Sequence, residues 1–256
     1  MIEQRETPDG GVPARPLAVV TGASAGIGEA IATRLAAEGY RLILGARREE
    51  RLGEVAGRLG AEARILDVAD EASVAAFCTG IDRLSVLVNN AGGARGLDPL
   101  AQARSDTWRW MWEVNVLGLM QMTRALLPAL EASGQGHIVN VSSTAGLEVY
   151  EGGSGYTSAK HGVHAISKTL RLELAGRPIR ITEVSPGMVE TDFSLNRFEG
   201  DAARAATVYQ GVTALTAQDV ADVVAFAVTR PAHVNLDEIV MRPVQQASAQ
   251  KVVRRS

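Results

Sequence analysis

The most constraining feature of the chain is a glycine-rich turn between an apolar run and an amphipathic segment. The apolar run is LAVVT at 17–21, and the turn, TGASAGIG at 21–28, spaces Gly22, Gly26 and Gly28 as Gly-x-x-x-Gly-x-Gly. A strand, a tight glycine turn and a helix N-terminus together form a binding site for an anion such as a pyrophosphate. The simpler alternative is that these glycines only permit the tight turn.

Short apolar runs alternate with longer amphipathic segments along the rest of the chain. Runs buried on both faces and joined by helices form a parallel sheet with helices on each side. The sequence therefore predicts an α/β fold with a doubly wound, Rossmann-like parallel sheet of seven strands in a single domain. The expected strands are 17–21, 41–46, 62–68, 85–92, 136–143, 179–187 and 237–244, and the expected helices are 29–39, 49–59, 70–80, two within 105–133, 155–175 and 217–229.

Composition argues against several classes of protein. Of 256 residues, 46% are hydrophobic and 21% charged, an ordinary globular balance. The formal net charge of −3 provides no basic field for nucleic acid, and no apolar run approaches the ~20 residues that span a bilayer. Residues 1–15 lack the apolar core of a signal peptide and are expected to be a flexible leader before a domain at 16–245. The basic tail at 246–256 is expected either to be disordered or to reach a neighbouring subunit.

The cysteine and histidine content points to a cytoplasmic protein without a metal. Cys78 is the only cysteine, which fits a reducing compartment, and we expect it to be a small packing residue. The histidines do not stand at metal-ligand spacing with carboxylates or cysteines, so no metal site is predicted. They are His137, His161, His164 and His233.

Two arginines occupy the position that distinguishes an NAD site from an NADP site. A site for NAD usually carries Asp or Glu at the end of the second strand, where it accepts a hydrogen bond from the ribose 2′-hydroxyl. Here that position reads Ala46-Arg47-Arg48. Two guanidinium groups would instead bind a 2′-phosphate. We therefore predict NADP, with a solvated start of the next helix as the alternative reading.

Tyr156 and Lys160 stand four residues apart in GYTSAKHG at 155–162. On a helix, this spacing places the two side chains one turn apart on the same face. A nearby positive charge favours the phenolate and lowers the pKa of a tyrosine, as a general acid or base requires. A surface tyrosine that packs on a lysine stem is the simpler explanation of this pattern alone.

Taken together, these motifs resemble those of one family, the short-chain dehydrogenases/reductases. The glycine turn, NNAG at 89–92, Asn115, Ser143, Tyr156-x-x-x-Lys160 and Pro186-Gly187 occur in the order and spacing of that family. The resemblance covers roughly residues 16–245. Segments such as GARREERL at 45–52 and FSLNRFEGD at 193–201 further resemble the branch of NADP-dependent 3-hydroxy acid (serine) dehydrogenases and clavulanate-type aldehyde reductases.

The resemblance implies a catalytic set of four residues. Tyr156 would exchange a proton with the substrate oxygen, and Ser143, rather than the adjacent Ser142, would donate a hydrogen bond to the same oxygen. Lys160 would hold the nicotinamide ribose and lower the pKa of Tyr156 against the opposing effect of burial. Asn115 would bind a water molecule that links Lys160 to solvent.

The resemblance also implies which residues hold the NADP. Asp67 would contact the adenine, although it could instead cap the following turn, and Asn89 could instead satisfy backbone groups at the end of its strand. The implied cofactor-binding residues are Gly22, Ser24, Ala25, Gly26, Ile27, Gly28, Arg47, Arg48, Asp67, Val68, Asn89, Asn90, Ala91, Gly92, Tyr156, Lys160, Pro186, Gly187, Val189 and Thr191.

These features predict an NADP-dependent oxidoreductase that acts on a small hydroxy or carbonyl compound, such as a 3-hydroxy acid, a serine-like compound, an aldehyde or a ketone. A non-catalytic regulatory protein that binds NADP with the same fold is the alternative. A hydroxy acid would need a cation near the catalytic pair, and Arg197 is favoured over Arg95 and Arg204. Trp108, Trp110 and Trp112 are expected to serve packing or a subunit interface.

The family resemblance also implies a homotetramer. The segments 105–133 and 155–175 carry apolar residues on more than one face, and the sheet covers only one of these faces. The residues that indicate this are Leu117, Leu119, Met120, Met122, Ala165, Ile166 and Leu170.

Overall fold

The structure, a computed structural model, describes residues 15–255. The predicted leader at 1–15 lies outside these residues except for Arg15, whose side chain donates to the carbonyl of Gly39. The predicted single α/β domain with one seven-stranded parallel sheet is confirmed.

All seven strands run parallel, in the spatial order β3-β2-β1-β4-β5-β6-β7. The strand order reverses direction between β1 and β4, and a crevice opens at such a point beside the carboxyl ends of the strands. The strands are β1 (Leu17–Thr21), β2 (Arg41–Ala46), β3 (Glu62–Ile65), β4 (Val86–Asn89), β5 (Gly136–Val141), β6 (Ile179–Pro186) and β7 (Glu238–Met241).

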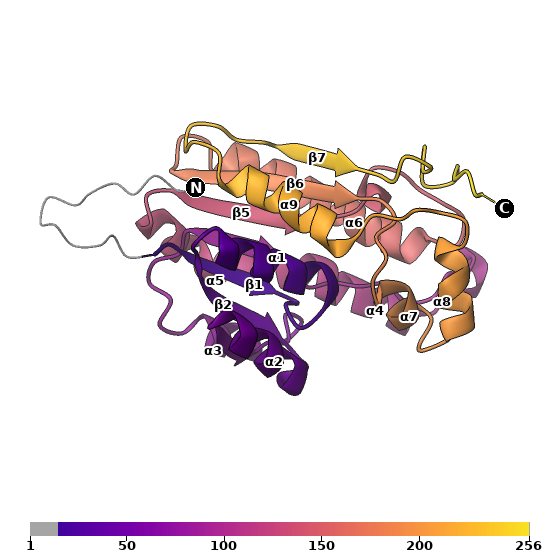
Figure 1. Cartoon of the computed structure of the whole chain (residues 1–256), viewed down its shortest axis with the longest axis horizontal. Helices are drawn as coiled ribbons and strands as arrows, with labels where there is room; N and C mark the ends of the chain where they lie inside the picture. Colours follow the sequence, from indigo (N-terminus) through magenta and orange to yellow (C-terminus); the bar gives the residue numbers. More distant parts are fainter. Residues whose placement is uncertain (1–14, 256) are drawn as a thin grey trace, which may run out of the picture.

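Helices cover both faces of the sheet. One face packs against α1, α2 and α9, and the other against α3, α5 and α6, while α7 and α8 lie beyond the carboxyl ends of the strands (Figure 1). The helices are α1 (Gly26–Ala37), α2 (Glu49–Leu59), α3 (Glu71–Cys78), α4 (Ser105–Trp112), α5 (Gly118–Ala132), α6 (Ser154–Glu173), α7 (Phe193–Arg197), α8 (Ala202–Tyr209) and α9 (Ala217–Val228), with short turns η1 (Leu100–Gln102), η2 (Glu113–Leu117) and η3 (Thr144–Gly146).

Successive residues of β1 reach the two separate cores. Val20 lies in the core beneath α1 and α9, where it is grouped with Ile31 and Val224, and all three are fully buried. Val19 points the other way, into the core that contains Met122 of α5. Strands buried on both faces are continuously apolar, which is why the sequence showed runs and not alternation.

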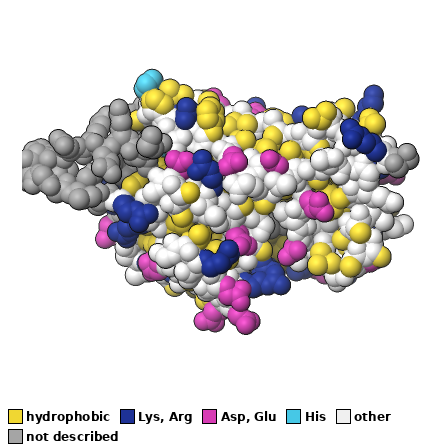
Figure 2. All heavy atoms as spheres, in the orientation of Figure 1, with side chains coloured by type: hydrophobic (Ala, Val, Ile, Leu, Met, Phe, Trp, Pro, Cys, Tyr) yellow, Lys and Arg dark blue, Asp and Glu magenta, His cyan; other side chains and the backbone are white. Residues whose placement is uncertain are grey.

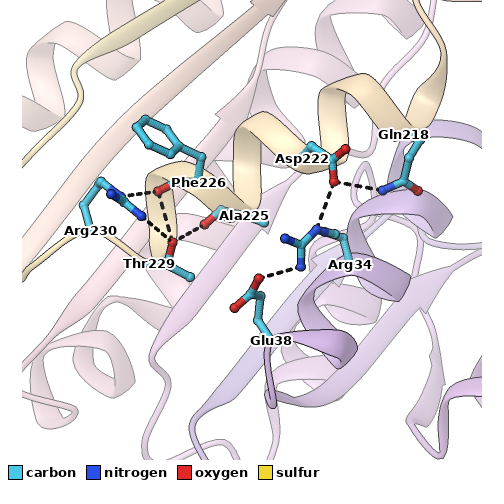
Figure 3. A network of polar contacts seen from close by, with 8 residues as sticks. All are labelled: Arg34, Glu38, Gln218, Asp222, Ala225, Phe226, Thr229 and Arg230. Atoms are coloured by element: carbon cyan, nitrogen blue, oxygen red, sulfur yellow. Dashed lines mark hydrogen bonds and ion pairs between the residues drawn. The ribbon is translucent and has the colours of Figure 1, made fainter. Parts of the chain in front are cut away.

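Charged side chains lie at the surface of the seam, the line along which α1 packs against α9. Arg34 donates to Asp222 at 2.9 Å and also pairs with Glu38 (Figure 3). Asp222 is 58% exposed, and exposed ion pairs contribute at most about 1 kcal/mol. The buried apolar residues therefore hold this seam together. Acidic and basic side chains are interspersed over the face in view (Figure 2), in agreement with the small net charge.

The structure differs from the expected elements in several places. The third strand, expected over 62–68, ends at Ile65, and the fourth, expected over 85–92, spans Val86–Asn89. A π-helical turn, η2, separates α4 from α5 inside the expected pair of helices at 105–133. The segment 188–213, which sequence patterns left without assigned elements, contains α7 and α8.

The apolar residues that indicated an assembly divide into two groups. Leu119 and Met122 are buried within the chain, so they do not support the tetramer prediction. Leu117 and Met120 are 44% and 36% exposed, Ala165 is exposed, and Ile166 and Leu170 are half-buried. The homotetramer stays a prediction that rests on this exposed group. Within residues 15–255, every helix falls short of the combined length and hydropathy that a membrane span requires.

Candidate active site

A cavity of about 890 Å³ lies at the carboxyl ends of the central strands. Its walls come from the turns after β1, β2, β4, β5 and β6, from α7 and α8, and from the C-terminal segment. Two of the predicted site residues, Asn89 and Asn115, are not part of its lining. The predicted residues that do line it are Gly22, Ser24, Ala25, Gly26, Ile27, Gly28, Arg47, Arg48, Asp67, Val68, Asn90, Ala91, Gly92, Ser143, Tyr156, Lys160, Pro186, Gly187, Val189 and Thr191.

At one end of the cavity, the backbone of the glycine turn packs closely against neighbouring groups. Gly22 and Gly26 have φ values of 67° and 58°, in the left-handed region that glycine adopts without strain. A Cβ on Gly28 would collide with the carbonyl of Gly22 and lie 2.5 Å from Nδ2 of Asn90. Ala25, the N-cap of α1, offers no side-chain cap, so the helix N-terminus is left to a ligand. These residues fit a dinucleotide pyrophosphate.

The NNAG turn is tied directly to the glycine turn. Oγ1 of Thr21 accepts hydrogen bonds from the N–H groups of Asn90 (3.0 Å) and Ala91 (2.9 Å) and donates to the carbonyl of Val88. Nδ2 of Asn90 donates to the carbonyl of Thr21 at 2.9 Å. The two turns that form the floor of the cavity therefore hold each other in place.

Arg48 lies directly beside the glycine turn. Its Nε and Nη2 both donate to Oγ of Ser24, at 3.2 and 3.0 Å. Arg47 is exposed and also lines the cavity. Asp67 lines the cavity and also caps the following turn, since its Oδ1 accepts from the N–H of Ala69. The capping reading of Asp67 is therefore confirmed, and its contact with the adenine stays a prediction.

Tyr156 and Ser143 form the reactive end of the cavity. Tyr156 is 8% exposed and faces the ring of Phe193, with ring centroids 5.6 Å apart. Burial raises the pKa of its phenol above the ordinary range, while a hydrogen bond with Ser143 and the charge of Arg197 act in the opposite direction. Burial wins in this structure, so Tyr156 is a phenol with its proton in place.

Lys160 lies one turn further along α6 and is 6% exposed. Its Nζ donates to the carbonyl of Val141 at 3.0 Å and stands 5.9 Å from the centroid of the Tyr156 ring. Burial lowers the pKa of Lys160 to about 8, and the charge of Glu183 opposes that shift. Lys160 is not among the groups that shift the pKa of Tyr156 in this geometry, so the lowering of that pKa by Lys160 stays a prediction.

Asn115 sits in the π-helical turn η2, beside Lys160. Its Nδ2 donates to the carbonyls of Gly93 (2.8 Å) and Met111 (2.7 Å). A Cβ on Gly92 would lie 2.5 Å from Oδ1 of Asn115 and 3.7 Å from Nζ of Lys160. Gly92 therefore keeps open the space between these two side chains, although Asn115 itself does not line the cavity.

Asn89 points away from the cavity into the core beneath α5 and α6. Its Nδ2 donates to Oγ1 of Thr123 and to Oδ1 of Asn140, both at 3.0 Å. Asn140 in turn donates to Ser167 of α6. Asn89 therefore supports the strand ends through side-chain bonds, and a direct cofactor contact from it stays a prediction.

Sequence patterns missed several residues of the cavity wall. Trp110 was expected to serve packing or an interface, yet it lines the cavity with the guanidinium of Arg95 stacked 4.0 Å from its ring centroid. Phe193 also lies beside Tyr156 in the apolar cluster at the reactive end, together with Tyr150, a loop residue for which the sequence left open a substrate contact or a surface role. Each is a single aromatic residue in a loop or at a short helix, where no periodicity marks its orientation.

The C-terminal segment folds back onto its own chain. Oε1 of Gln246 accepts from the N–H of Met188 at 2.9 Å, and Arg254 donates to the carbonyls of Val208 and Gln210 at the end of α8. Gln246 and Arg254 also line the cavity. The basic tail that sequence left unplaced is thus part of the wall.

Comparison with protein families identifies the family of this chain. The chain matches the model described as short chain dehydrogenase over residues 16–202. The chain belongs to the short-chain dehydrogenase family. The prediction that it is an oxidoreductase enzyme of this family is confirmed.

Two relatives and one solved structure cover nearly the whole of this short-chain dehydrogenase. An uncharacterized oxidoreductase of Mycobacterium tuberculosis H37Rv is 56% identical over 235 residues, 92% of this chain and 94% of that protein. The NADP-dependent 3-hydroxy acid dehydrogenase of Escherichia coli K12 is 40% identical over 240 residues, 91% and 97% of the two chains. The closed form of a serine dehydrogenase complexed with NADP+ has a TM-score of 0.89 at 40% identity, with 94% and 100% covered. The Escherichia coli relative is named NADP-dependent and the serine dehydrogenase structure contains NADP+, in agreement with the predicted cofactor.

We predict that Gly28→Ala removes dinucleotide binding in this short-chain dehydrogenase. The added Cβ has no room beside Gly22 and Asn90, so the turn must move, and a displacement of about 1 Å in such a site costs roughly 100-fold. Gly53→Ala in α2 is the matched control, because a Cβ there meets no atom within 4 Å. Fluorescence titration with NADPH measures both, and equal affinity of Gly28→Ala and wild type would contradict the close approach.

Proposed function

We propose that this short-chain dehydrogenase transfers a hydride between NADP and a small hydroxy or carbonyl compound, with Ser143, Tyr156, Lys160 and Asn115 as its proton relay. The observation that carries the proposal is the convergence of Ser143 and Tyr156 on one end of a cavity whose other end is a glycine turn suited to a pyrophosphate. NADP supplies the hydride when it is bound, and the protein supplies placement and proton transfer.

Each residue of the relay has a distinct task. In reduction, Tyr156 gives its phenolic proton to the substrate oxygen, while Ser143 donates a hydrogen bond to that oxygen. The raised pKa of the phenol suits this role as an acid. In oxidation Tyr156 must act as a phenolate, which requires a positive charge close by, and Lys160 is the buried cation on the same helix face. Asn115 lies beside Lys160 and binds the water molecule that links Lys160 to solvent.

The arginines that line the cavity indicate which class of substrate it binds. Arg95, Arg197 and Arg204 all line the cavity, but Arg95 stacks on Trp110 and Arg204 lies 4.3 Å from the ring centroid of Phe198. Arg197 lies 5.9 Å from the centroid of the Tyr156 ring. Of the three arginines, these positions support Arg197 as the one that lies beside the Tyr156 ring.

The hydrogen bonds of Arg197 leave part of its guanidinium for a ligand. Nε donates to the carbonyl of Gly96 at 2.8 Å, and Nη1 donates to the Tyr150 hydroxyl at 3.2 Å. Among residues 15–255, no carboxylate forms an ion pair with it. A fixed guanidinium without an acidic partner binds a carboxylate well. We therefore favour a 3-hydroxy acid or serine-like substrate, consistent with the relatives named for 3-hydroxy acids and serine.

We predict that Tyr156→Phe lowers turnover by roughly 10²- to 10⁴-fold, because it removes the acid–base group. NADPH absorbance, followed with a panel of hydroxy acids, aldehydes and ketones, measures the loss. Tyr40→Phe is the matched control, since Tyr40 is also buried (7% exposed) but lies in the core beneath α1 and α2. If wild type binds NADPH yet turns over no member of the panel, a regulatory role replaces this proposal.

We predict that Arg47→Asp weakens NADPH binding and spares or improves NADH binding. Charge-assisted hydrogen bonds to a phosphate are worth about 1.5–3 kcal/mol, so the loss is roughly 10- to 100-fold. Arg41→Asp makes the same charge change at the amino end of β2 and should leave the preference intact. Equal affinity of the wild-type protein for both cofactors would contradict the assignment.

We predict that Arg197→Ala impairs a hydroxy acid selectively over its neutral analogue. Loss of a charged partner costs about 1.5–3 kcal/mol, so kcat/KM for the acid should fall at least roughly 10-fold further than kcat/KM for the analogue. Arg204→Ala is the comparison variant. A parallel fall for both substrates, or a selective fall in Arg204→Ala alone, would remove Arg197 as the carboxylate anchor.

A further inference from the structure

Lys160 carries a charge that its surroundings do not favour. The side chain is 6% exposed, and one hydrogen bond, to the carbonyl of Val141, is formed by an ammonium that has three donors. A buried charge is costly unless an opposite charge or several hydrogen bonds compensate for it. The relay requires the ammonium form, so something near Lys160 must stabilise it.

A buried carboxylate lies on the strand that α6 covers. Glu183 of β6 is 2% exposed, and its Oε1 accepts from the Ser185 hydroxyl at 3.0 Å. Nδ1 of His164 lies 3.1 Å from Oε2 of the same carboxylate. His164 follows Lys160 by four residues on α6, so the two side chains share the helix face toward β6.

The register of the sheet explains why Glu183 faces α6. Asn89, Asn140 and Glu183 are direct neighbours across β4, β5 and β6. Asn140 donates to Ser167 of α6, so this row of polar side chains points toward that helix. The first two members are neutral amides, Glu183 is the buried acid, and the row continues to the exposed Glu238 of β7.

We propose that Glu183 is a positioning residue, a buried counter-ion held by His164 and Ser185 that keeps Lys160 in its ammonium form. The inference rests on the proposed function, in which Lys160 serves the relay. Glu183 is not among the residues that line the cavity, so in this proposal it acts on the relay through Lys160.

The charged surroundings of Lys160 leave this task to Glu183. Tyr156 and His164 are ionisable side chains one turn away on its own helix, and Arg197 of α7 lies over the Tyr156 ring. The turn η2, which packs on α6, holds the buried Asn115 and the half-buried carboxylate of Glu113, and η3 contributes the uncharged Thr144–Gly146. Among the described residues, Glu183 is the carboxylate that raises the pKa of Lys160 against the effect of burial.

The consequence is a defined change in the pH profile. Without the Glu183 charge, the pKa of Lys160 falls below its value of about 8, and the ammonium is lost at a lower pH. The alkaline limb of kcat/KM for NADPH, which reports the free enzyme, should move to lower pH. Nearby opposite charges typically shift a pKa by about 1–3 units, so a displacement of about 1 pH unit is expected.

The test compares wild type, Glu183→Gln, His164→Gln and Glu173→Gln. The pH dependence of kcat/KM for NADPH and of the NADPH Kd, by fluorescence, are measured for each protein. Glu183→Gln should move the alkaline limb to lower pH by about 1 unit. His164→Gln retains a neutral hydrogen-bond donor to Glu183, so its alkaline limb should stay at the wild-type pH. Glu173→Gln removes an exposed carboxylate from the same helix, and its alkaline limb should stay at the wild-type pH as well.

An unchanged limb in folded Glu183→Gln would overturn the inference. If that variant does not fold, His164→Arg places a permanent cation against Glu183, and an unmoved limb there would overturn it equally. The Kd readout does not depend on turnover. If Tyr156→Phe keeps the wild-type activity, the proposed relay is refuted. If activity depends on Tyr156 but the alkaline limb of Glu183→Gln does not move, only the role of Glu183 is refuted.

Discussion

The burial of a single ammonium group is the constraint on which this active site depends. Lys160 is buried one helical turn from Tyr156, and burial lowers its pKa to about 8 and favours the neutral amine. The same burial raises the pKa of Tyr156 and keeps the phenol protonated. In the proposed relay, proton exchange between Tyr156 and the substrate oxygen therefore depends on how the protein compensates one buried charge.

The parallel sheet supplies that compensation through its strand ends. The carbonyl of Val141 at the end of β5 accepts from Lys160, and Glu183 of β6 contributes the opposing charge. Two strands away, the turn after β1 approaches the turn after β4 so closely that Gly28 has no room for a Cβ. The carboxyl ends of the strands thus carry both the turn that fits a dinucleotide and the residues of the proposed relay, so under the proposed function the fold itself aligns hydride and proton transfer.

Sequence patterns predicted the parts of this arrangement that depend on local order. The seven strands, the glycine turn and the Tyr156–Lys160 helix face all follow from apolar runs and i, i+4 spacing. The row that joins Asn89, Asn140 and Glu183 could not be found this way, because it depends on register between strands that are distant in sequence. The wall residues Trp110 and Gln246 were missed for the same reason, since their orientation is set by tertiary packing rather than by a local pattern.

The central claim concerns the charge on Lys160, and an NMR pH titration of the lysine side chains in the cofactor-free protein tests it most directly. The chain has three lysines, so Lys160 is readily distinguished from the exposed Lys168 and Lys251 with a Lys160→Arg variant. The account predicts that Lys160 loses its proton near pH 8. A Lys160 pKa at the ordinary lysine value of 10.5 would contradict it, because burial would then not oppose the charge that the relay requires.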